Sequence, residues 1–354
     1  MQATSGPLRA GLLSQVRDRL RVHRAHLRTR EYATTALNPP ATPGVDIPVT
    51  AADGTRLSVL AYGPADGEVI VFVHGWTCSL EYWNPQINAF AGSYRVIAYH
   101  LRGHGDSELG RSPLTTDLLA DDLNVVLDAT LRPAQRAVLV GHSLGGAAIQ
   151  AWAARYPGQV PKRAAAALLT NTPIGNIIGE TTLVPLFNRL LPLPRWLGRL
   201  GLRFPFMFPP IAPMTWVIRH RFTSADATAD IVNFSMAIMR SCPAMVRAKF
   251  GALVADLDLG RAAAELTIPT TLIAGAHDRL IPVIHAERIA EILTEAGSLE
   301  KLEILPTGHL SSVEAFEQFN DELAKILTAV YGPAQPAPSY PPQLPSETGS
   351  GRAR

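Results

Sequence analysis

The pentapeptide Gly141-His142-Ser143-Leu144-Gly145 lies between an apolar run, Ala137 to Val140, and a helical pattern, Ala147 to Tyr156. This order predicts a strand, a sharp turn and a helix, with Ser143 at the apex of the turn. The glycines leave room for a tight turn that strains the serine backbone and points its hydroxyl out of the sheet. A G-x-S-x-G match alone arises by chance in about one chain in ten of this size. The strand and helix around it therefore carry the prediction of a nucleophile.

Two candidate partners for this serine follow strands further along the chain. The apolar stretch Thr270 to Ala274 leads into a loop that carries Asp278, and the short strand Leu302 to Leu305 leads to His309. A serine nucleophile needs a histidine base and an acid that orients this histidine. The chain order serine, acid, histidine belongs to one of three unrelated serine-triad arrangements. We predict Ser143, Asp278 and His309 as the catalytic residues.

The chain resembles the α/β-hydrolase-fold enzymes, over roughly residues 45–331. Four separated motifs carry this resemblance: His74-Gly75-Trp76 after the strand Val69 to Val73, Arg102 to Ser107 after the strand Arg95 to Leu101, the serine turn, and the loops of Asp278 and His309. The resemblance implies an α/β fold with a predominantly parallel, eight-stranded-type sheet, helices on both faces and an inserted helical cap. It also implies an esterase-like or lipase-like serine hydrolase.

The same resemblance implies an oxyanion hole made by the backbone N–H groups of Trp76 and Leu144. Epoxide hydrolases and haloalkane dehalogenases of similar fold use an aspartate nucleophile. Serine at position 143 argues against both of these classes.

Each predicted catalytic residue also has a structural interpretation. Ser143 would be an ordinary turn serine, Asp278 a helix cap or ion-pair partner, and His309 one of ten histidines with structural roles. The rival position for the acid, after the strand Ala165 to Leu169, reads Thr170-Asn171-Thr172-Pro173 and offers no carboxylate. Only His309 follows the last predicted strand with a glycine before it. These observations favour the catalytic interpretation.

Other histidines are better explained as structural. We expect His74 and His142 to brace turns. His100 and His104 have the i, i+4 spacing of a metal-binding pair, but Gly103 lies between them and no glutamate adjoins His100. No G-x-G-x-x-G follows the early strands and no G-K-[ST] occurs. We predict neither a metal nor a cofactor.

Composition and spacing predict the organisation of the chain. With 354 residues and 47% apolar content, the chain can bury one large α/β core. We assign residues 45–173 and 262–331 to this core, because strands and helices alternate there. Residues 174–261 interrupt the alternation and are assigned to a cap or lid. Residues 1–44 form a basic arm and linker, and the Pro-rich residues 332–354 are expected to be disordered.

Several classes of location and partner are disfavoured. Two cysteines, Cys78 and Cys242, permit at most one disulfide, and neither a signal-peptide h-region nor a run of about 18 apolar residues occurs. A cytoplasmic protein is expected. Nucleic-acid binding is disfavoured, because the net charge of +2 comprises +6 in residues 1–30 and −4 in the remainder.

The basic arm suggests a possible partner. Residues 1–30 contain seven arginines and one acidic residue, Asp18, and Leu12 to Tyr32 is predicted to be helical. The favoured interpretation is a solvated arm that packs loosely on the body. The alternative is a peripheral contact of its arginines with an anionic membrane or a partner.

The predicted cap bears on the substrate. Leu183 to Phe222 contains six arginines and no acidic residue, and Phe204 to Pro210 is strongly apolar. An apolar cover over a serine site favours a lipophilic ester or thioester; the alternative is that these side chains pack the cap onto the body. The same triad also serves thioesterases, lactonases, cofactor-free perhydrolases and carbon–carbon bond hydrolases. The leading interpretation is a carboxylic ester hydrolase, and a non-catalytic ligand-binding protein is the alternative from a different class.

Overall fold

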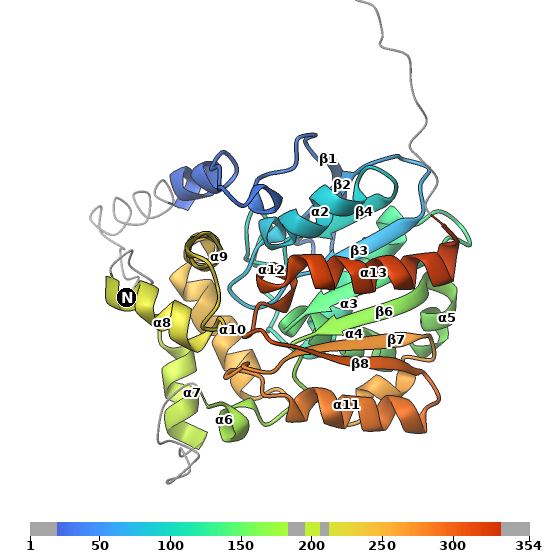
Figure 1. Ribbon diagram of the computed structural model, residues 1–354. Coiled ribbons are helices and arrows are strands. Elements are labelled where there is room, and N and C mark those ends of the chain that lie inside the picture. Colours follow the sequence, from blue (N-terminus) through green and yellow to red (C-terminus); the bar gives the residue numbers. More distant parts are fainter. Residues whose placement is uncertain (1–19, 183–194, 206–211, 334–354) are drawn as a thin grey trace, which may run out of the picture.

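An eight-stranded sheet forms the centre of the protein (Figure 1). A computed structural model describes residues 20–182, 195–205 and 212–333. The strand order is β1-β2-β4-β3-β5-β6-β7-β8, and every neighbouring pair is parallel except β1 with β2 and β2 with β4. The strands are β1 (Val45–Thr50), β2 (Arg56–Tyr62), β3 (Val69–Val73), β4 (Arg95–Tyr99), β5 (Ala137–His142), β6 (Ala164–Thr170), β7 (Thr270–Gly275) and β8 (Leu299–Leu305). The predicted α/β fold with a mostly parallel sheet is confirmed.

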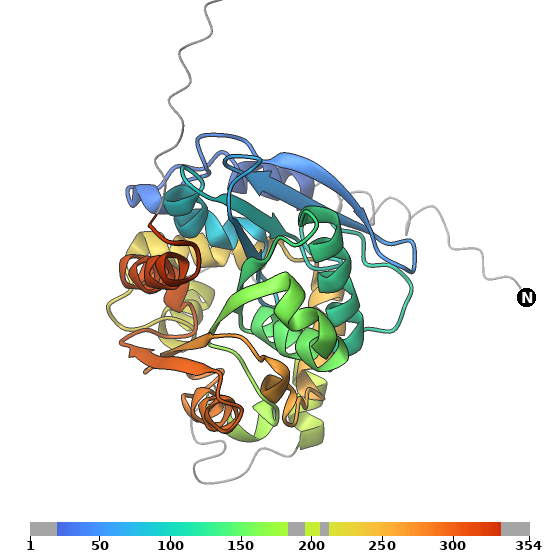
Figure 2. The ribbon, with the colours of Figure 1, turned by 90° about the vertical axis from the view of Figure 1, so that its right-hand side faces the viewer.

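Helices cover both faces of this sheet. In β3 the side chains of Val69, Val71 and Val73 join one apolar core, and those of Ile70 and Phe72 join the other. This alternation follows from the strand period of two. Figure 2 shows α13 on one side of the sheet and α3 on the other. The helices outside the segment between β6 and β7 are α2 (Asn84–Phe90), α3 (Thr116–Thr130), α4 (Leu144–Arg155), α5 (Val160–Arg163), α11 (Ile284–Glu295), α12 (Ser311–Glu314) and α13 (Phe316–Tyr331). Short 3-10 turns lie at Thr35–Leu37, Leu80–Trp83, Pro157–Gln159 and Ala262–Glu265.

The helix after the serine begins earlier than the sequence pattern predicts. α4 starts at Leu144 and not at Ala147, although Gly145 and Gly146 weaken the helical pattern. Both glycines are required by packing. A Cβ on Gly145 would lie 2.1 Å from the carbonyl oxygen of Val73, and one on Gly146 would lie 2.5 Å from Thr172 Oγ1. The first turn of α4 therefore lies directly against the sheet.

The last strand is longer than predicted. β8 starts at Leu299 and not at Leu302. The prediction missed this start because the exposed Glu300 and Lys301 interrupt any apolar run. β8 is an edge strand of the sheet, and edge strands tolerate this pattern.

Residues 174–261, which we call the inserted segment, connect β6 to β7. The described helices are α6 (Ile177–Glu180), α7 (Arg195–Arg203), α8 (Ala212–Arg221), α9 (Ala229–Ser241) and α10 (Ala244–Ala255). Residues 183–194 and 206–211, which include most of the apolar stretch 204–210, lie outside the described residues. The segment contacts loops at the carboxyl ends of the strands: the Trp76 indole donates to Arg247 O at 3.0 Å, and His309 N donates to Phe222 O at 2.8 Å.

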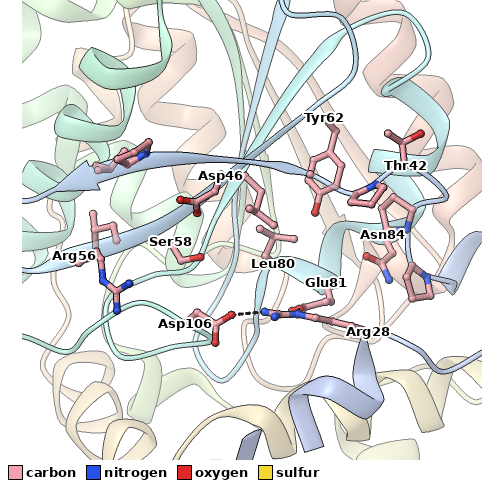
Figure 3. A pocket seen from close by; sticks show the side chains of 18 of the residues that line it. Arg28, Thr42, Asp46, Arg56, Ser58, Tyr62, Leu80, Glu81, Asn84 and Asp106 are labelled. Carbon is pink, nitrogen blue, oxygen red and sulfur yellow. Dashed lines mark hydrogen bonds and ion pairs between the residues drawn. The ribbon is translucent and has the colours of Figure 1, made fainter. Parts of the chain in front are cut away.

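The arm packs against the body through one face. Residues 20–27 are helical and Leu27 is buried; residues 1–19 lie outside the described part, as do residues 334–354 of the predicted disordered tail. Arg28 pairs with Glu81 at 2.8 Å and with Asp106 at 2.6 Å, and Arg24 lies 3.7 Å from Asp106. Figure 3 shows Arg28 reaching Asp106; both residues line a cavity of about 540 Å³ beside β1 and β2. These two arginines of the arm therefore face the protein.

Two further predictions have structural outcomes. Cys78 and Cys242 are both buried and unpaired in the described residues. None of the helices described is long and apolar enough to cross a membrane.

Candidate active site

Ser143 occupies a strained turn between β5 and α4. Its backbone torsions are φ 52° and ψ −119°, outside the regions that L-residues favour. Ser143 is only 8% exposed. A Cβ on Gly75 would lie 2.9 Å from Ser143 Cβ, so the loop after β3 passes directly beside the serine. A strained, nearly buried serine next to a second backbone segment has the geometry of a nucleophile elbow.

His309 lies between Ser143 and Asp278. Its Nε2 is 3.1 Å from Ser143 Oγ, and its Nδ1 is 2.7 Å from Asp278 Oδ2. Because a carboxylate only accepts hydrogen bonds, Nδ1 carries the proton and Nε2 is left to accept the serine proton. The structure thus brings together the three residues predicted as a triad, although 166 positions separate the serine from the histidine.

Four donors converge on the Asp278 carboxylate. Oδ1 accepts from the N–H groups of Leu280 and Ile281, each at 2.9 Å. Oδ2 accepts from His309 and, at 2.9 Å, from Asn171 Nδ2. These bonds fix the carboxylate in one orientation.

Asn171 is a site residue that sequence reasoning missed. Its amide also donates to Gly308 O at 3.2 Å, and its φ of 47° turns the chain sharply after β6. The sequence showed only that this position lacks a carboxylate. Its place at the end of the neighbouring strand was the available signal that its side chain would reach Asp278.

Glu314 is a second residue that the sequence analysis missed. Its carboxylate accepts from the N–H groups of Gly308 and Leu310, at 3.1 and 3.2 Å, on either side of His309. It also accepts from Ser224 N in the inserted segment at 2.6 Å. Burial raises the pKa of Glu314. The carboxylate therefore ties the histidine loop to the inserted segment, and no local motif around Glu314 indicates this.

The two candidate oxyanion donors lie on either side of the serine. Leu144 is the first residue of α4, where helix N–H groups have no intrahelical acceptor. Trp76 follows Gly75 in the loop that passes beside Ser143, and its indole points to α10. Within the described part of the chain, neither backbone N–H donates a hydrogen bond. Both groups are therefore available to a ligand oxygen.

Four further histidines near the site make structural contacts. His142 Nε2 donates to His309 O at 2.9 Å, and His74 accepts from Leu101 N at 3.1 Å while donating to Gly75 O. His100 accepts from Leu80 N, and His104 donates to a backbone carbonyl. The described residues contain no group of three or more His, Cys, Asp or Glu suited to a metal ion.

Acid is expected to destabilise the protein through these buried histidines. Burial lowers the pKa of His74, His100, His104 and His142, in His104 to about 3. Below about pH 6.5 the unfolded chain therefore binds protons that the folded protein does not. For each histidine, the free energy of unfolding should fall by about 1.4 kcal/mol for every unit by which the pH is lowered. Urea unfolding across a pH series measures this slope.

The control for this slope is His104→Leu. It should lower proton uptake on unfolding by about one proton near pH 5. A free energy of unfolding that is constant from about pH 7 to pH 5 would contradict the assignment of neutral, buried imidazoles.

Comparisons with known proteins agree with this architecture. The chain is 33% identical over 286 residues to a protein named as a carbamate hydrolase, RutD, from Variovorax paradoxus, covering 78% of this chain and 97% of that protein. It is 26% identical over 276 residues to 3-oxoadipate enol-lactonase 2 of Acinetobacter baylyi, covering 78% and 94%. A thermophilic esterase from Thermogutta terrifontis superposes with a TM-score of 0.63 at 22% identity, covering 82% and 99%, which shows a shared fold.

The sequence model of the Alpha/beta hydrolase family matches residues 70–323. This range holds the serine turn, both partner loops and the inserted segment, and it covers well over half of the chain. The predicted resemblance is confirmed, and the chain belongs to the alpha/beta hydrolase family.

Proposed function

We propose that this protein is a serine hydrolase that cleaves a carboxylic ester through Ser143, His309 and Asp278. One observation carries the proposal: His309 Nε2 lies 3.1 Å from Ser143 Oγ while Nδ1 lies 2.7 Å from Asp278. The relation to hydrolases supports the same reaction class.

The mechanism follows from this arrangement. Ser143 Oγ attacks the acyl carbon and passes its proton to His309 Nε2, and Asp278 stabilises the imidazolium. The carbonyl oxygen becomes an oxyanion that the N–H groups of Trp76 and Leu144 bind, each worth about 3 kcal/mol. His309 then protonates the leaving alcohol, which leaves an acyl-serine. Water, deprotonated by His309, releases the acid and restores the serine.

A lipophilic acyl group is the proposed substrate class. The inserted segment contributes Phe222, whose carbonyl holds the His309 backbone and whose side chain contacts both apolar cores. Trp76 is partly buried between the serine loop and α10. These side chains favour an apolar acyl chain over a charged one.

Carbamate hydrolysis is a second candidate. The relative named as a carbamate hydrolase aligns over nearly its whole length. The same nucleophile attacks a carbamate carbonyl and forms a carbamoyl-serine. An enol-lactone is a related substrate, in view of the second relative.

The test is a rate profile on p-nitrophenyl esters from acetate to dodecanoate, with a carbamate and an enol-lactone measured beside them. A rise of kcat/KM with acyl length supports the lipophilic ester. Higher kcat/KM on the carbamate or the lactone would replace it with the second candidate. A protein that turns over none of these compounds and resists a fluorophosphonate would leave the non-catalytic binding function.

A further inference from the structure

Large apolar side chains are exposed on two helices of the inserted segment. Ten large hydrophobic residues are exposed among those described, and five of them lie between positions 196 and 216. Trp196 is 66% exposed, Phe204 62%, Leu200 58% and Trp216 55%; Leu197 is the fifth. Scattered apolar residues on a surface need no explanation, but such a concentration marks an interaction surface.

The helix geometry explains why these side chains face outward. In α7 the body-facing side carries Gly198 and Leu202: a Cβ on Gly198 would lie 2.5 Å from Ile178, and one on Gly251 of α10 would lie 2.0 Å from Leu202 O. Trp196 and Leu200 are each two positions from Gly198, which is about 200° around a helix. They therefore lie opposite the packed side, and none of the residues that the structure describes buries them.

α8 repeats this arrangement. Ile218 is fully buried, and Trp216, two positions before it, is exposed. Figure 1 shows α7 and α8 along the same side of the molecule, far from α5. One extended surface can therefore contact both helices.

The charge of these helices identifies the partner. Residues 195–205 and 212–222 contain five arginines and no acidic residue. Arg199 pairs with Asp256, whereas Arg203 is exposed and no ion pair to it occurs within the described residues. Two copies of this face would repel each other, so self-association is disfavoured. Arginine beside exposed Trp, Leu and Phe on a short amphipathic helix is suited to an anionic lipid surface.

We propose that α7 and α8 bind the surface of an anionic lipid bilayer, with Trp196, Leu200 and Trp216 in the headgroup region and Arg203 on the lipid phosphates. This proposal does not depend on the proposed reaction. It assigns lipid contact to the inserted segment, whereas Arg24 and Arg28 of the arm are paired with the body.

The experiment is sedimentation of the full chain with phosphatidylglycerol-containing vesicles and with pure phosphatidylcholine vesicles, together with tryptophan emission. We expect binding and a blue shift with the anionic vesicles, and loss of binding near 1 M salt, where the Debye length is about 3 Å. Trp196→Ser with Leu200→Ser should weaken the partition at least tenfold. The matched control, Val45→Ser with Ile304→Ser, changes two exposed residues of the edge strands and should bind like wild type.

A charge variant tests the electrostatic part. Arg203→Glu should weaken binding by more than about fivefold, the effect of losing one cation at an anionic surface. The control Arg136→Glu, at the amino end of β5, should not weaken binding to the vesicles. Ser143→Ala should bind like wild type, which separates lipid binding from turnover.

Three outcomes would overturn the proposal. They are absence of binding to the anionic vesicles, equal binding by the Trp196/Leu200 variant and its control, and a dimer in solution that the Trp196/Leu200 variant converts to monomer. The last outcome would identify the face as a contact between copies. Thermal unfolding of each variant verifies that it folds.

Discussion

Ser143→Ala is expected to lower kcat by about 10⁶-fold on any substrate that the wild type turns over. Without Oγ, no acyl-serine forms, and His309 and the oxyanion donors are left to act on a bound ester with water. Substrate still meets the same surroundings, so KM should change little. Steady-state kinetics on the preferred p-nitrophenyl ester measures the loss, and fluorophosphonate labelling should disappear with it.

Ser93→Ala is the matched control for this variant. Ser93 lies in the turn that precedes β4, at the opposite end of the sheet from the site, and its loss should leave kcat unchanged. If Ser143→Ala retains more than about one hundredth of the wild-type kcat, another residue is the nucleophile and the proposed function is wrong.

Asp278→Asn is expected to lower kcat by about 10⁴-fold. All four groups around this carboxylate are donors: the N–H groups of Leu280 and Ile281, the Asn171 amide and His309 Nδ1. An asparagine amide would place its NH₂ against one of these donors. The least costly response is a change of tautomer in which the His309 proton moves from Nδ1 to Nε2. Nε2 can then no longer accept the serine proton.

The measurement is kcat and KM for Asp278→Asn beside Asp66→Asn, an exposed aspartate in the turn before β3. A loss confined to kcat indicates the wrong imidazole tautomer. Asp278→Asn with wild-type kcat would show that this carboxylate has only a structural role.

Asn171 offers a rescue of this variant. It lies 2.9 Å from the same Asp278 oxygen that binds His309, so Asn171→Asp places a carboxylate close to the histidine. Combined with Asp278→Asn, this change should recover part of the lost kcat. In the wild-type background it should lower activity, because it puts two carboxylates next to one another and removes a donor.

Most of the fold could be predicted from local sequence, because buried parallel strands are continuous apolar runs and the turns between them carry glycine. β3 was predicted with its observed bounds, and β7 to within one residue. The errors arose where a helix or strand is stabilised by contacts with residues that are distant in the sequence. α4 extends back through two glycines because it packs on Val73 O and Thr172, and β8 gains its charged half by pairing with β7.

The sequence by itself determined the order of the strands and helices and the identity of Ser143, Asp278 and His309 as candidates, because torsional strain, apolar periodicity and position after a strand are properties of neighbouring residues. Only the tertiary structure decided that Asn171 and Glu314 hold the acid and the histidine loop. It also turned Arg24 and Arg28 toward the body and left Trp196 and Leu200 exposed. These contacts join residues far apart in the chain, and they depend on the register of strands and on which side of each helix packs, which no short segment specifies.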